Sequence, residues 1–174
     1  MASHAGNHTK SVDAKGRVFL PRPLQDKFTA RVEDEGSPVL VVFRSARGCL
    51  NLWLKEDFEA MVLELEDSDL TDAQYHELLR GIYDNKLERA WDSQKRILLS
   101  TPLLEYACLL DHVLFLEVGK GVEIWNPKKG EAARAVSTHL MEEHGALTPP
   151  RGRAGLNISA STSVQVSPEA NEGS

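Results

Sequence analysis

Two aspartate–arginine pairs with the same spacing are the residues of this chain best suited to chemistry. The first pair is Asp13 and Arg17, and the second is Asp92 and Arg96, which follows 79 positions later. The planar fork of an arginine matches phosphate oxygens and the O6/N7 edge of guanine in the major groove of DNA. An aspartate at this spacing can hold that fork in one rotamer. Each pair is therefore interpreted as a structural ion pair, as a DNA-reading arginine, or as both at once.

The residues around the two pairs extend the candidate DNA-binding site. Lysines on both turns add positive charge, and a glycine in the first turn suits a left-handed backbone position. The candidate DNA-binding residues are Asp13, Lys15, Gly16, Arg17, Asp92, Lys95 and Arg96.

An enzyme is the weakest interpretation. The six histidines are scattered along the chain, and we find no phosphate-binding loop, nucleophile elbow or Cys/His cluster. The sequence therefore predicts no catalytic residue, no metal site and no cofactor.

The elements that position the two pairs repeat along the chain. Each pair lies in a predicted hairpin, followed by a short helix and a second pair of strands that ends in Leu-x-Leu-Trp or Val-x-Ile-Trp. The first half contains a hairpin over Ser11–Leu20, a helix over Pro21–Phe28, and strands over Val39–Phe43 and Cys49–Leu54. The second half contains Ala90–Leu99, Thr101–Ala107 and a hairpin over Val113–Trp125. Three further helices are predicted. One spans Lys55–Glu66, a second begins after a capping box at Thr71, and a third spans Pro127–Glu143.

The repeat predicts an α+β fold in which each half needs the other, because the strands of one half cannot close a sheet alone. Paired, the halves are expected to form a small β-barrel with a pseudo-twofold axis. The predicted segments are an N-terminal segment 1–7, a first half-unit with the helical pair 8–87, a second half-unit 88–145, and a disordered tail 146–174.

The net charge of −6 is unevenly distributed. Residues 1–31 carry a balance of +4, and residues 56–72 carry a balance of −8. Because salt screens charges beyond about 8–10 Å, a binding surface responds to its local charge rather than to the total. No apolar run approaches the length of a membrane span, and the first residues lack the apolar core of a signal peptide. A soluble, cytoplasmic protein without a membrane partner is expected.

The doubled Asp-x-x-x-Arg motif, with the elements that follow it, resembles the MraZ family over roughly residues 8–144. The resemblance implies tandem AbrB-like swapped-hairpin units that form a pseudo-twofold β-barrel with flanking helices. It also implies a bacterial transcriptional regulator, acting mainly as a repressor of a division and cell wall gene cluster. Such a protein would bind repeated boxes of double-stranded DNA in its own promoter as a ring-like homo-oligomer, in the cytoplasm at the nucleoid.

Lys95 departs from the family pattern, which has glycine at this place in the second motif. If the backbone there needs a positive φ, lysine costs on the order of 1 kcal/mol relative to glycine.

Two other functions stay open: an AbrB-like antitoxin-type module with a protein partner, and an oligomeric scaffold that does not read DNA.

Overall fold

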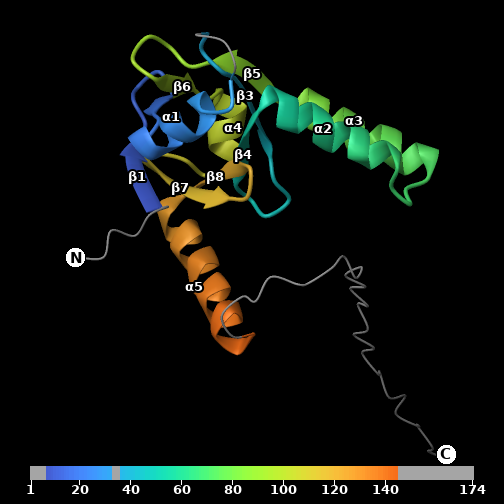
Figure 1. Cartoon of the computed structure of the whole chain (residues 1–174). Helices are drawn as coiled ribbons and strands as arrows, with labels where there is room; N and C mark the ends of the chain where they lie inside the picture. The colour runs from blue at the N-terminus through green and yellow to red at the C-terminus, as the bar shows by residue number, and fades with distance from the viewer. Residues whose placement is uncertain (1–6, 33–35, 145–174) are drawn as a thin grey trace, which may run out of the picture.

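The repeated sequence folds into two sets of like elements around one core (Figure 1). The computed structural model describes residues 7–32 and 36–144. The first half contains β1 (Asn7–Ser11), β2 (Arg17–Phe19), α1 (Arg22–Thr29), β3 (Val39–Arg44) and β4 (Leu50–Leu54). The inserted helices are α2 (Lys55–Glu66) and α3 (Asp72–Asp84). The second half contains β5 (Leu87–Ala90), β6 (Arg96–Leu98), α4 (Thr101–Tyr106), β7 (His112–Val118) and β8 (Gly121–Trp125), and α5 (Pro127–Glu143) follows it.

Local sequence signals account for most of these boundaries. In β4, the alternation of Leu50, Leu52 and Leu54 buries one face of the strand, as the pattern predicts. The side chain of Thr71 accepts a hydrogen bond from the backbone of Gln74, and the Gln74 side chain returns to the backbone of Thr71. This capping box satisfies N–H groups at the start of α3. The α+β class is therefore confirmed, and so are the predicted helices at Lys55–Glu66 and after Thr71.

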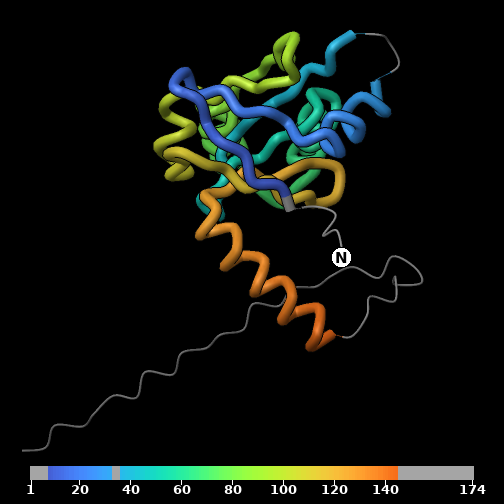
Figure 2. The backbone as a smooth tube through the Cα atoms, turned by 90° about the vertical axis from the view of Figure 1, so that its left-hand side faces the viewer, coloured from blue at the N-terminus to red at the C-terminus, as the bar shows by residue number. Residues whose placement is uncertain are grey.

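The main sheet joins strands from both halves. Its order is β1-β7-β8-β4-β3-β5, with every neighbouring pair antiparallel. The counterparts in the two halves are β1 and β5, β3 and β7, and β4 and β8. Exchanging each strand with its counterpart gives β5-β3-β4-β8-β7-β1, which is the same order read from the opposite edge. The outer strands lie beside strands of the other half: β1 pairs with β7, and β5 pairs with β3 (Figure 2). Neither half could bury its strands without the other.

A second, two-stranded sheet consists of β2 and β6 and is called the ribbon below. Val18 and Ile97 are paired at its centre and point into the core, where they are 0% and 4% exposed. They join one apolar cluster built from both halves, which includes Phe28 of α1 and Leu103 of α4. The ribbon is therefore anchored by two side chains at its centre, and its other face is turned outward.

The prediction of a closed barrel was wrong. The six-stranded sheet is open, with β1 and β5 at its two edges, and the ribbon does not join its ladder. The first predicted hairpin is also short. Its first strand, β1, pairs with β7, and between the two sides of the hairpin there is a single β-bridge, from Val12 to Val18. Packing of Val18 and Ile97 covers the core on the ribbon side, so no further hydrogen-bonded closure is required.

The predictions for the two chain ends fall on residues that the structure does not describe. Residues 1–6 of the predicted N-terminal segment and the predicted tail 146–174 lie outside the described residues. Among the helices of the described ranges, none is long and apolar enough to cross a membrane.

A buried carboxylate of α2 binds the segment that directly follows α1. Asp57 is 7% exposed and accepts two hydrogen bonds from the guanidinium of Arg31, one of them at 2.8 Å from Nη2 to Oδ1. The Arg31 hydrogen bond is the main cause that holds the pKa of Asp57 below its ordinary value. A lowered folded-state pKa means that the stabilisation is present above the unfolded pKa and is lost as the pH falls through the folded pKa.

Asp57→Asn is therefore expected to lower the free energy of unfolding by about 1–3 kcal/mol at pH 7. The difference from wild type should shrink as the pH falls below about 3.9, the ordinary pKa of an aspartate. Urea unfolding at pH 7 and pH 3 measures both values. Asp26→Asn is the matched control, because its ion pair with Arg22 is exposed. An Asp57→Asn difference that is the same at both pH values would contradict this account.

Candidate nucleic-acid interface

The two aspartate–arginine turns have the same backbone hydrogen bonds. In the first, the N–H of Gly16 donates to the carbonyl of Asp13 at 2.9 Å. In the second, the N–H of Lys95 donates to the carbonyl of Asp92 at 2.9 Å. Gly16 and Lys95 both have left-handed backbones, with φ of 79° and 61°. The second turn is thus as regular as the first, although a lysine occupies its left-handed position.

Each aspartate fixes its turn and its arginine together. Asp13 Oδ1 accepts the backbone N–H groups of Lys15 and Arg17, both at 2.9 Å, and Oδ2 accepts Nε of Arg17 at 2.7 Å. The backbone N–H of Arg17 is the main cause that lowers the pKa of Asp13. Because the carboxylate holds the arginine through Nε, it leaves both terminal nitrogens of Arg17 without a bond within the described part of the chain.

The second pair has the same bonds, except that Nη2 of Arg96 also lies 2.7 Å from Asp92 Oδ2. Asp92 Oδ1 accepts the N–H groups of Gln94 and Arg96 at 2.9 Å, and Oδ2 accepts Nε of Arg96 at 2.8 Å. The guanidinium of Arg96 is the main cause that lowers the pKa of Asp92. The Arg96 side chain is 19% exposed, compared with 32% for Arg17, so the second arginine is held more closely.

The ribbon brings both arginines to one surface. Arg17 lies opposite Leu98, and Arg96 lies opposite Phe19. Since alternate residues of a strand share a face, these four side chains lie on the face opposite to buried Val18 and Ile97. A groove of about 230 Å³ beside them is lined by Arg17, Arg89, Ala90, Asp92, Arg96 and Leu98. Motifs far apart in the sequence therefore form one surface, which we call the arginine face: Arg17, Phe19, Arg89, Arg96 and Leu98.

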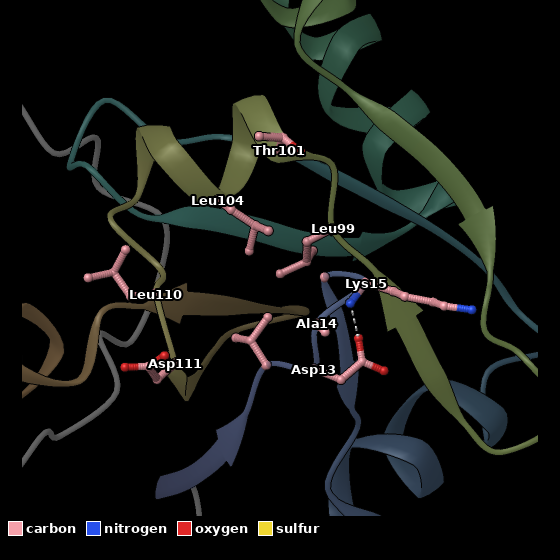
Figure 3. A pocket seen from close by; sticks show the side chains of 10 residues that line it. Asp13, Ala14, Lys15, Leu99, Thr101, Leu104, Leu110 and Asp111 are labelled. Atoms are coloured by element: carbon pink, nitrogen blue, oxygen red, sulfur yellow. Dashed lines mark hydrogen bonds between the residues drawn. The ribbon is translucent and has the colours of Figure 1, made fainter.

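The lysines of the turns lie close in sequence to the two arginines, Lys15 two residues before Arg17 and Lys95 directly before Arg96. Figure 3 shows the Lys15 side chain extending away from Leu104 and Leu110, which lie behind the first turn. Lys95 Nζ lies 4.8 Å from the centre of the Trp91 ring. This cation–π contact offsets part of the cost of a left-handed lysine. In the described ranges, no acidic side chain pairs with Lys15 or Arg89, so both cations are available to an anion.

A cavity lies behind the first turn and shows how the halves depend on each other. It has a volume of about 510 Å³ and is lined by the turn together with residues of the second half, among them Leu99, Thr101 and Asp111 (Figure 3). The N–H of Leu99 donates to the carbonyl of Gly16 at 2.9 Å, and the N–H of Leu20 donates to the carbonyl of Lys95 at 3.0 Å. Each turn is therefore held by the strand end of the other half.

The acidic run of residues 56–72 lies away from the arginine face. Its acidic residues lie on α2, on the connection to α3 and at the first residue of α3, and these two helices extend from the body on the side opposite to β6 (Figure 1). The overall charge of −6 therefore does not describe the surface around the ribbon.

The sequence interpretation missed three residues of the arginine face: Phe19, Leu98 and Arg89. The first two could have been found, because each lies two positions after a candidate arginine on the same strand. Arg89 could not, since its place in the groove depends on the pairing of β5 with β3.

Comparisons with known proteins identify the family. A family model described as "MraZ protein, putative antitoxin-like" matches residues 1–81. The Transcriptional regulator MraZ of a Marinomonas species is 35% identical over 129 residues, which cover 74% of this chain and 83% of that protein. The chain belongs to the MraZ family. A Nocardioides protein of the same name is 32% identical and matches 70% of this chain and 79% of its own length. The MraZ protein of Gluconacetobacter diazotrophicus is 28% identical, with 78% and 85% covered.

Membership of the MraZ family decides the broad class of function. Its relatives are named as transcriptional regulators, so the chain belongs with regulators of transcription and not with enzymes. Among the described residues of this MraZ-family chain, no group of three or more histidine, cysteine, aspartate or glutamate side chains could hold a metal ion.

Proposed function

We propose that this protein is a sequence-specific regulator that binds double-stranded DNA through the arginine face and acts mainly as a repressor. Its targets would be a division and cell wall gene cluster, including its own promoter, and it would act in the cytoplasm at the nucleoid. The observation that carries the proposal is that both aspartate-held arginines lie on the outward face of one two-stranded ribbon.

The shape of the ribbon suits a duplex. The major groove of B-DNA admits a two-stranded β-ribbon, and arginine is the commonest reader of guanine there. Asp13 and Asp92 restrict the rotamers of Arg17 and Arg96 before binding, so less side-chain entropy is lost on contact. Lys15 and Lys95 are then placed to meet the phosphates beside the groove.

We further propose that the two halves, 8–87 and 88–145, are AbrB-like swapped-hairpin units related by a pseudo-twofold axis. The symmetric strand order and the reciprocal hydrogen bonds between the two turns support this arrangement. A local twofold axis would present the two arginines to the duplex in opposite directions, as a palindromic half-site pair requires.

We propose a ring-like homo-oligomer because two separate surfaces expose large apolar side chains. On α5 these are Val136, Leu140 and Met141, which are 61%, 47% and 58% exposed. On α2 and α3 they include Leu63, Leu78 and Tyr83, which are 62%, 41% and 46% exposed. These helices leave the body in different directions (Figure 1). Two different surfaces in contact form a heterologous interface, which gives a ring when the rotation closes.

The apolar side of α5 offers a prediction for the ring. Replacing Val136, Leu140 and Met141 with serine is expected to give a smaller particle without unfolding, because these side chains are exposed. Light scattering after size-exclusion chromatography measures the mass. Val118→Ser is the matched control, since Val118 is 52% exposed but lies at the end of β7. A particle of unchanged mass would exclude α5 from the interface.

DNA binding tests the proposed function directly. Fluorescence anisotropy compares DNA upstream of the protein's own gene with a scrambled duplex at two salt concentrations. We expect tight binding that resists the scrambled competitor and weakens steeply with salt, because cations on the protein displace counterions from phosphates. Shortening the DNA from several repeated boxes to one should weaken binding by about 10²–10⁴-fold, since a ring makes later contacts intramolecular. Equal binding to both duplexes would contradict sequence-specific regulation.

A second candidate function is an antitoxin-type module with a protein partner, which the description of the matched family favours. It predicts that a second small protein co-purifies with the chain. A scaffold that assembles without reading DNA predicts oligomers but no preference for the upstream DNA.

A further inference from the structure

We infer that Phe19 and Leu98 read thymine methyl groups, as apolar specificity contacts set directly beside Arg96 and Arg17. This inference rests on the proposed function, because it says which base feature the arginine face recognises in addition to guanine.

Exposure is the first argument. Phe19 is 49% exposed and Leu98 is 36% exposed, although their strand neighbours Val18 and Ile97 are almost completely buried. The two outward residues therefore leave much of their apolar surface in water. Core packing accounts for apolar side chains at Val18 and Ile97, which are buried. It does not account for a large apolar side chain at Phe19, which is exposed.

Position is the second argument. Across the ribbon, Phe19 lies opposite Arg96, and Leu98 lies opposite Arg17. Side chains directly opposite each other in an antiparallel pair have Cβ atoms about 4.5–5.5 Å apart. The guanidinium carbon of Arg96 lies 5.8 Å from the centre of the Phe19 ring, so this arginine and this ring are in reach of each other. Each arginine thus forms one unit with an apolar side chain.

The chemistry of the major groove gives such a unit a ligand. Thymine presents its C5-methyl group there, and guanine presents the O6 and N7 acceptors that arginine binds. A unit of arginine and phenylalanine, or of arginine and leucine, matches a thymine close to a guanine. Phe19 is the larger and more exposed of the two, so its contact should be the stronger.

Charge favours a duplex over a second copy of this chain as the occupant of this surface. Phe19 and Leu98 lie among Arg17, Arg89 and Arg96, and these three arginines line the groove beside them together with Asp92, so positive charge is in excess there. Two such faces in contact would place like charges together, whereas phosphates would neutralise them.

Deoxyuridine tests the inference, because it lacks the methyl group and keeps the base-pairing groups of thymine. Anisotropy compares upstream DNA made with thymine against the same duplex made with deoxyuridine throughout. Burying one methyl group corresponds to about a fourfold change in affinity, so wild type should bind the thymine duplex at least about fourfold more tightly. Phe19→Ser should weaken binding to the thymine duplex and bring the ratio between the two duplexes towards one.

Val118→Ser is the matched control, since it removes an equally exposed apolar side chain from another surface and should leave the ratio unchanged. Wild-type protein that binds both duplexes tightly and equally would overturn the thymine inference and leave the proposed function standing. Wild-type protein that binds neither duplex would overturn both. A Phe19→Ser variant that keeps the wild-type ratio would overturn the role of Phe19. The wild-type comparison and Leu98→Ser keep the test decisive if Phe19→Ser does not fold.

Discussion

Arg17→Ala will lower the affinity for the upstream DNA by about 10–100-fold, because one well-placed arginine–guanine contact contributes about 1–3 kcal/mol. The structure gives the reason: Asp13 holds Arg17 through Nε, so the carboxylate leaves the terminal nitrogens for a ligand. Arg17→Ala/Arg96→Ala should lose roughly the product of the two effects. Anisotropy with upstream and scrambled duplexes measures both variants.

Arg22→Ala is the matched control for Arg17→Ala. Arg22 is also a first-half arginine with an aspartate four positions away, and its Nε lies 3.1 Å from Asp26 Oδ1. It lies on α1 and not on the ribbon, so its loss should change the affinity little. Thermal unfolding separates binding from stability, because an ion pair as exposed as Asp13–Arg17 contributes about 0–1 kcal/mol. Lost binding together with a much lower melting temperature would favour a purely structural ion pair.

Gly16→Ala will destabilise the protein by about 2–4 kcal/mol, through a strained backbone and an overlap. Gly16 has a φ of 79°, which L-residues rarely adopt. A Cβ atom at this position would lie 2.7 Å from the carbonyl oxygen of Leu99 and 3.2 Å from Cδ1 of Leu104. The backbone oxygen cannot move aside without shifting the strand end that supports the turn. Urea unfolding measures the loss.

Gly48→Ala separates the two causes. Gly48 has a φ of 78°, but a Cβ atom there would meet no atom within 4 Å. It should therefore show only the backbone cost of about 1–2 kcal/mol. Equal losses for Gly16→Ala and Gly48→Ala would show that the contact with Leu99 is unimportant. Lys95→Gly completes the series, since it relieves the left-handed backbone but removes the contact with Trp91.

Local patterns in the sequence determined much of this protein. The alternation in Leu50–Leu54, the capping box at Thr71 and the apolar spacing of Lys55–Glu66 all depend on residues close in the chain, and their elements formed as predicted. The turn at Gly16 also formed, since a left-handed glycine is a local preference. The doubled motif further identified the family, which the Marinomonas relative confirms.

Only the tertiary structure decided how the halves combine. The expected barrel is an open sheet, because β1 pairs with β7 and the ribbon covers the core by packing. The arginine face also depends on long-range pairing: Arg17 lies opposite Leu98 because β2 pairs with β6, and Arg89 arrives through β5. Strand pairing between distant segments is selected by the burial of both halves together. No local pattern of residues encodes that choice, so the sequence gives the two motifs, and the packing makes them one surface.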